Sequence, residues 1–312
     1  MDSNEKQQRA AAYIRGVLEA RGLPRNQVAA FSGLSNTYIQ HLENGQIQNV
    51  DRKKLIALAV ALSLDLDEID NMLKVFDRAS LNEEDIPDFL EASGAPKITS
   101  AMLPLHAWFT YELITLIGET IPGRLIIVNE APTANVTPEG FRSYFNKGKL
   151  NPHPIYFKLI EAVGQKRRRN FIHTLRRYPV EHYICRTCLE AYVRGYADDE
   201  EKYWKYKHIE SLIHVLDKYD NFTFFLTDIC PRFNFTLKIP DQAIGENEKL
   251  FFQGKAPHSH LWEKEQELLG FATENQVVIK NFMSAIKYIE KNTLGEFHDR
   301  QAMIQYLRGL LI

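Results

Sequence analysis

The stretch that decides the fold of the first part of this 312-residue chain is residues 22–45, GLPRNQVAAFSGLSNTYIQHLENG. Pro24 suits the first turn of a helix, where no backbone donor is lost, and Gly33 can adopt the left-handed conformation that ends one. Ser35 is placed to cap a second helix with its hydroxyl. The Asn-Gly pair at 44–45 then stops that helix. The stretch therefore predicts two short helices joined by a sharp turn.

The apolar residues of this stretch predict how the two helices pack. Ala29 is small enough to let the helices approach closely, and the apolar interior is expected from Val28, Leu34, Ile39 and Leu42. Two helices held at a steep angle by such a turn form a helix-turn-helix, in which the second helix enters the major groove of DNA and the first crosses the backbone. The spacing satisfies this geometry.

Helical patterns continue on both sides of the stretch. Residues 10–22 place apolar side chains on one face of a preceding helix. Asp51 is expected to cap a fourth helix, and a fifth begins near Asp67. The sequence thus predicts an all-α domain of five short helices over residues 1–78.

Several short motifs resemble the lambda-repressor-like, Cro-type (XRE) family of transcriptional regulators over residues 10–75. The shared residues are Gln27-Val28-Ala29, Gly33-Leu34-Ser35, Ile39, Leu42-Glu43-Asn44-Gly45 and Leu58-Ala59-x-x-Leu62. One departure stands at the start of the second helix, where the family usually has Ser-Gln and this chain has Pro24-Arg25. A glutamine-mediated contact at that point is therefore not expected, although an arginine can still bind a phosphate.

The resemblance implies a set of DNA-binding residues. Asn36, Thr37 and His41 would face base edges with help from Gln40, because amides suit adenine and threonine can contact thymine. The residues placed near phosphates or beside the recognition helix are Arg25, Ser35, Asn44 and Gln46. The alternative is that these are ordinary solvated positions on a helix surface.

The charge of the whole chain gives no indication of a polyanionic partner. Its formal net charge is -2, from 38 basic and 40 acidic residues. Residues 1–54 hold eight Lys or Arg against five Asp or Glu, a local excess of three positive charges. A field this weak implies modest non-specific affinity, so we expect a homodimer that engages two half-sites about one helical turn apart.

The rest of the chain has a different pattern. Residues 79–100 are acidic, contain Pro87, Gly94 and Pro96, and are expected to be a linker with about one helical turn. Residues 101–312 mix strand-like segments with helical periodicity and predict an α+β domain that senses a ligand or mediates dimerisation. The expected strands are residues 124–130, 222–228, 233–239 and, more weakly, 249–253.

One motif in this second domain has the residue types of a metal or redox site. His182 precedes the pair Cys185 and Cys188, and on a helix these three side chains would share one broad face, with His258 or His260 as a further ligand. No second paired-ligand motif follows. The simpler interpretation is two reduced cysteines packed as small apolar residues, so we expect no metal and no cofactor.

The function expected from the sequence is therefore a cytoplasmic, sequence-specific transcription regulator that binds double-stranded DNA. Common enzymatic motifs and apolar segments long enough to span a membrane are absent from the sequence, and an enzyme is not expected. The effector of the second domain would be a small molecule or a peptide. Two alternatives stay open: a peptide-sensing quorum regulator with a helical receptor domain, and a toxin-antitoxin or enzyme component that carries a helix-turn-helix.

Overall fold

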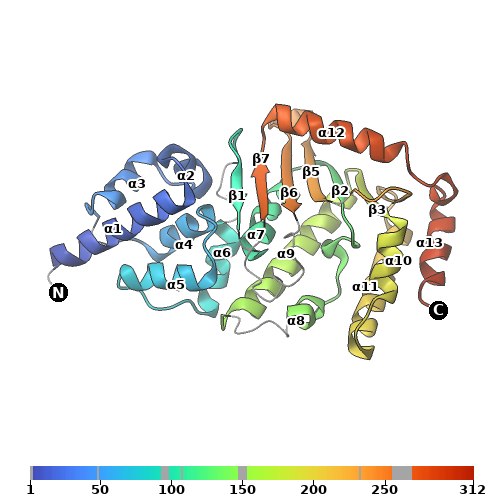
Figure 1. Cartoon of the computed structure of the whole chain (residues 1–312), viewed down its shortest axis with the longest axis horizontal. Coiled ribbons are helices and arrows are strands. Elements are labelled where there is room, and N and C mark those ends of the chain that lie inside the picture. The colour runs from blue at the N-terminus through green and yellow to red at the C-terminus, as the bar shows by residue number, and fades with distance from the viewer. Residues whose placement is uncertain are drawn as a thin grey trace. The chain divides into compact units, whose positions relative to one another are not determined.

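The computed structural model describes residues 3–47, 49–92, 98–106, 108–146, 153–231, 233–254 and 269–312, which are shown in Figure 1. The chain divides into two compact units. The first comprises residues 1–117, 149–159 and 256–273, and the second comprises residues 118–148, 160–255 and 274–312. The boundary falls within two helices, α7 (Trp108–Thr120) and α9 (Tyr156–Leu175). Over the described ranges, no helix combines the length and the apolar character that crossing a bilayer requires.

The first unit begins with the five helices that the sequence predicts (blue to cyan in Figure 1). They are α1 (Ser3–Arg21), α2 (Arg25–Ser32), α3 (Asn36–Glu43), α4 (Arg52–Ala61) and α5 (Leu66–Val75). The all-α fold expected for the N-terminal region is therefore confirmed. Helix α1 starts seven residues earlier than its apolar periodicity indicated, because its first two turns are polar.

The helix ends form where the sequence places them. Ser35 accepts a hydrogen bond from the backbone N–H of Tyr38 at 3.1 Å, and Asp51 accepts one from Lys53 at 2.8 Å. Helix α5 begins one residue before Asp67, and Asp65 caps it and forms a reciprocal capping box with Glu68. Each cap satisfies backbone donors that a helix start would otherwise leave unpaired.

The segment expected to be a linker carries more structure than one turn. A 3-10 turn (Glu83–Asp85) leads directly into helix α6 (Ile86–Ala92). Phe89 on α6 is fully buried, and the carboxylate of Asp85 binds the Arg52 guanidinium at 2.5 Å and 2.6 Å. The acidic composition and Pro87 suggested a loop, but a proline is tolerated in the first turn of a helix.

Seven strands occur among the described residues. The first unit holds β1 (Leu103–Leu105) and β7 (Leu269–Thr273), which pair antiparallel. The second holds five strands in the order β6-β5-β2-β3-β4: β2 (Gly123–Val128), β3 (Val180–Cys185), β4 (Phe222–Thr227), β5 (Asn234–Pro240) and β6 (Lys249–Gly254). The four expected strands correspond to β2, β4, β5 and β6, whereas β1, β3 and β7 were not predicted.

The sheet of the second unit is mixed and has helices on both faces. Strands β2, β3 and β4 run parallel, and β5 and β6 are antiparallel to their neighbours. One face packs on α9, α10 (Arg186–Arg194), α11 (Asp199–Lys218) and α13 (Arg300–Gly309) through a single apolar cluster. On the other face Phe235 packs against Phe282 of α12 (Gln276–Glu290), with ring centroids 4.9 Å apart. A short helix, α8 (Phe141–Asn146), follows β2.

The mixed sheet distinguishes the expected α+β fold of the C-terminal region from a purely helical receptor domain. The α+β fold expected for the C-terminal region is confirmed by its mixed sheet and helices. A peptide receptor built from helical repeats would be almost purely helical, and the strands contradict that arrangement.

Candidate DNA-binding surface

Helix α3 turns its apolar side chains toward the core of the N-terminal bundle. Ile39 is fully buried and Leu42 is 2% exposed. They lie three residues apart, so they share one face of the helix. Val28 and Phe31 of α2 are also fully buried, whereas Leu34, which we expected in the interior, is only half-buried. These contacts fix which face of α3 points outward.

The outward face of α3 consists of polar side chains. Asn36, Thr37, Gln40 and His41 are all exposed, as are Ser35 at the start of the helix and Asn44 at its end. Gln46 is exposed just beyond the helix, where its N–H donates to the carbonyl of His41 at 2.9 Å. The structure thus places on one accessible ridge the residues that the family resemblance implies. Their contacts with bases or phosphates stay a prediction.

The turn between α2 and α3 is fixed by its own residues. Gly33 has φ 70° and ψ 8°, the left-handed conformation in which a β-carbon is strained. Ser32 Oγ donates to the carbonyl of Val28 at 2.7 Å and accepts from the N–H of Leu34 at 3.3 Å. The turn therefore sets the direction of α3 through local hydrogen bonds and one backbone conformation.

Arg25 differs from the other expected DNA-binding residues because it already has a protein partner. Its guanidinium forms a half-exposed ion pair with Glu43, the last residue of α3. Arg15 of α1 also donates to the backbone carbonyl of Glu43. Both arginines hold the C-terminal end of α3 in place. If Arg25 also contacts a phosphate, its guanidinium must bind the phosphate and the Glu43 carboxylate at the same time.

Most of the eight basic side chains of residues 1–54 form ion pairs with acidic side chains. The ion pairs are Lys6–Asp77, Arg21–Glu68, Arg25–Glu43, Arg52–Asp85 and Lys53–Glu91. Within the described ranges, Arg9, Arg15 and Lys54 have no carboxylate partner. The local positive excess is therefore carried by a few side chains.

Lys54 is a candidate phosphate contact that sequence reasoning missed. Its ammonium lies 4.6 Å from the ring centroid of Tyr38 on α3, and the lysine is exposed. Burial, together with the charge of Asp51, raises the pKa of Tyr38, so the ring stays neutral beside the lysine. Sixteen positions separate these residues in the chain, so only the packing of α4 against the motif brings them together.

The second set of candidate residues is arranged differently from the prediction. His182 and Cys185 lie on strand β3 and Cys188 on α10, so the expected single helix is wrong. Because successive strand residues alternate between faces, His182 and Cys185 point to opposite faces of the sheet. His182 is fully buried against Phe224, and neither ring nitrogen hydrogen-bonds to a described residue. Burial lowers its pKa to about 3. His258 and His260 fall outside the described residues.

Comparison with known proteins identifies a helix-turn-helix in the N-terminal domain. Residues 14–69 match the family model described as Helix-turn-helix, and these residues are a helix-turn-helix domain of the XRE type. One solved structure is similar over 62% of this chain and 53% of its own: TrmBL2, described as an archaeal chromatin protein with a novel mode of DNA binding. Its sequence identity is 11% and the TM-score is 0.33. A search of curated proteins gave no match.

Proposed function

We propose that the protein is a sequence-specific, DNA-binding transcriptional regulator. The observation that carries this proposal is the exposed polar face of α3, held outward by the burial of Ile39 and Leu42. A recognition helix must present several hydrogen-bonding side chains that no protein group occupies. Asn36 and Gln40 offer amides for this purpose, and Thr37 offers a hydroxyl and a methyl group.

We assign each side chain to base contacts or to phosphate contacts from its exposure and charge. Asn36, Thr37, Gln40 and His41 would read base edges in the major groove. The phosphate contacts would come from Ser35, Asn44 and Gln46 beside the helix and from the ammonium of Lys54, with Arg25 sharing its charge between Glu43 and the backbone of DNA. Phosphate contacts position the domain, whereas base contacts select the sequence.

The protein is further proposed to act as a homodimer whose C-terminal region senses a ligand or a partner. Few cations around α3 lack a carboxylate partner, so a single domain would bind weakly at physiological salt. Two copies on adjacent half-sites would combine their binding free energies and so bind much more tightly than one. An effector that favours one dimer arrangement would then shift DNA binding. We propose regulation rather than catalysis; the alternative is a toxin-antitoxin or enzyme component that uses the same DNA-binding domain.

Selection from a random duplex library tests the proposal. The full-length protein is mixed with the library at low salt, and bound duplexes are recovered and sequenced over successive rounds. The expected result is one enriched sequence with two inverted half-sites whose centres lie about one helical turn apart. Recovery of duplexes without any enriched sequence would refute sequence-specific recognition. An enriched single half-site bound by one chain would refute the proposed dimer but not sequence-specific recognition.

A further inference from the structure

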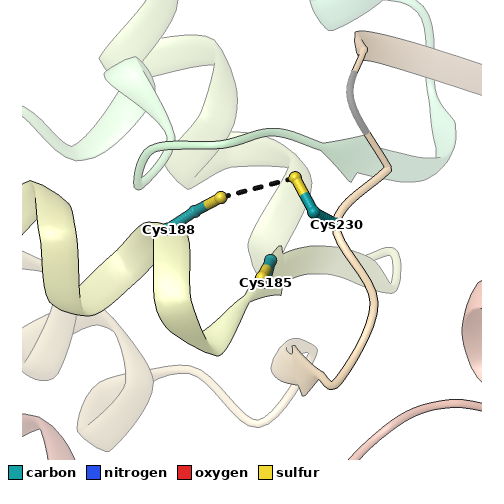
Figure 2. Close-up of side chains that lie close together, drawn as sticks. All are labelled: Cys185, Cys188 and Cys230. Carbon is teal, nitrogen blue, oxygen red and sulfur yellow. Dashed lines mark hydrogen bonds between the residues drawn. The ribbon is translucent and has the colours of Figure 1, made fainter.

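The second unit contains a cluster of three sulfur atoms that the DNA-binding surface does not explain. The Sγ atoms of Cys185, Cys188 and Cys230 all lie within 4.8 Å of one another, and those of Cys188 and Cys230 are 3.5 Å apart (Figure 2). They are the only cysteines in the chain. Their meeting at one point therefore needs a physical reason.

Three different elements bring the sulfurs together. Cys185 is the last residue of β3 and the N-cap of α10, Cys188 belongs to the first turn of α10, and Cys230 follows β4 in a loop. Because β3 and β4 are parallel neighbours, their C-terminal ends lie at the same edge of the sheet. This edge is where α/β sheets commonly hold their ligands.

The loop that carries Cys230 is tied to the sheet by hydrogen bonds. Thr227 Oγ1 donates to the carbonyl of Ile229 at 2.7 Å, and the N–H of Asp228 donates to the carbonyl of Asn292 at 3.0 Å. The hydroxyl of Thr227 is also 3.3 Å from the carbonyl of Ile184 on β3. These hydrogen bonds fix the chain immediately before Cys230 beside the C-terminal ends of β3 and β4.

Apolar packing does not account for this cluster. Cys185 is buried, but Cys188 is half-buried and Cys230 is exposed. A redox pair would need only Cys188 and Cys230 and would leave the third sulfur unexplained. Deprotonating several thiols this close together is unfavourable, because thiolates repel one another, and a bound cation removes that repulsion.

We propose that Cys185, Cys188 and Cys230 form a three-thiolate site for a thiophilic d10 metal ion of the Zn²⁺ type. Thiolate sulfurs bound at about 2.3 Å around a tetrahedral ion lie about 3.8 Å apart, close to the separations already present. The exposed side of Cys230 leaves the fourth position to a solvent molecule. Binding displaces one proton from each thiol to the buffer, so that one divalent ion and three thiols give a complex of net charge -1 and three protons.

Metal titration of the full-length, reduced and metal-free protein tests this site. Cd²⁺ serves as the probe, because its ligation by thiolate gives a charge-transfer absorbance in the ultraviolet, and Zn²⁺ affinity follows from competition with a chromogenic chelator. The variants are Cys188→Ser and Cys230→Ser, and Thr187→Ser is the matched control because this exposed hydroxyl lies between two of the cysteines. Circular dichroism verifies that each variant is folded.

The expected result is one ion per chain, a thiolate charge-transfer band, and release of up to three protons. Loss of one sulfur ligand should weaken Zn²⁺ binding by at least about 100-fold, while Thr187→Ser binds like the wild type. A missing thiolate band, or full affinity in Cys230→Ser, would overturn the proposal. So would a Cys188–Cys230 disulfide in protein that binds no metal, which would identify a redox pair instead. The outcome is independent of DNA binding.

Discussion

Gly33 gives the most specific prediction about how α3 is oriented. Its φ of 70° lies in the left-handed region, which costs a residue with a β-carbon about 1–2 kcal/mol. Replacing glycine by alanine also stiffens the unfolded chain, which offsets about 0.4–1 kcal/mol of that cost. We therefore expect Gly33→Ala to destabilise the N-terminal domain by about 1 kcal/mol net.

Gly16 provides a control with the opposite sign. It lies inside α1, is exposed, and a β-carbon built there meets nothing within 4 Å. Glycine in a helix interior is less stable than alanine by about 0.5–1 kcal/mol, so Gly16→Ala should stabilise the same domain. The two variants make the same chemical change, and only the backbone conformation differs.

Hydrogen exchange measured by mass spectrometry resolves this domain from the rest of the chain. Amides of α2 and α3 should exchange about 5-fold faster in Gly33→Ala, and those of α1 should exchange more slowly in Gly16→Ala. Gly33→Asn should fall between wild type and Gly33→Ala, because asparagine tolerates the left-handed region. Unchanged or slower exchange in Gly33→Ala would refute the turn geometry described for α3.

Three further predictions concern charge, acid stability and packing. Lys54→Ala should weaken binding about equally on all DNA sequences and should reduce the slope of log affinity against log salt concentration by about 1. Lys53→Ala should have a smaller effect, because the ammonium of Lys53 is paired with Glu91. Equal slopes in the two variants would exclude the Lys54 contact. Burial lowers the pKa of His182 from 6.5 to about 3, so the unfolded state takes up a proton first as the pH falls below 6.5. Unfolding free energy should therefore drop by about 1.4 kcal/mol per pH unit between pH 6 and 4 on account of this group, and His182→Leu should flatten the slope in urea titrations; an unchanged slope would contradict this. Ile39→Ala should lower the free energy of unfolding of the N-terminal domain by about 2–5 kcal/mol and accelerate hydrogen exchange throughout α3. Protection from exchange like that of the wild type would show that Ile39 does not anchor the helix.

The N-terminal domain is predictable from the sequence because its signals are local. Gly33, Ser35 and Asp51 each act on backbone groups within a few residues, and their spacing marks helix ends directly. The exposed face of α3 follows from the periodicity of Ile39 and Leu42. Lys54 could not be found this way, since its position beside Tyr38 depends on the packing of another helix.

The second half is less predictable because its signals are not local. Strand β3 contains His182 and Cys185 and lies between two parallel strands in a sheet with helices on both faces, so it lacks the alternation that marks half-exposed strands. The strands β1 and β7, of three and five residues, are too short to give a pattern. Cys230 is 42 positions beyond Cys188, and only the parallel pairing of β3 and β4 relates the two.

The most direct measurement of the central claim is how α3 discriminates between bases. Gln40→Ala and the matched control Gln301→Ala, an exposed glutamine on α13, are titrated against the selected duplex and its single-base variants. Gln40→Ala should lose about 1–3 kcal/mol of discrimination at one base step, and Gln301→Ala should bind like the wild type. Equal weakening of Gln40→Ala on every duplex, or no change at all, would contradict a base-reading role for this helix.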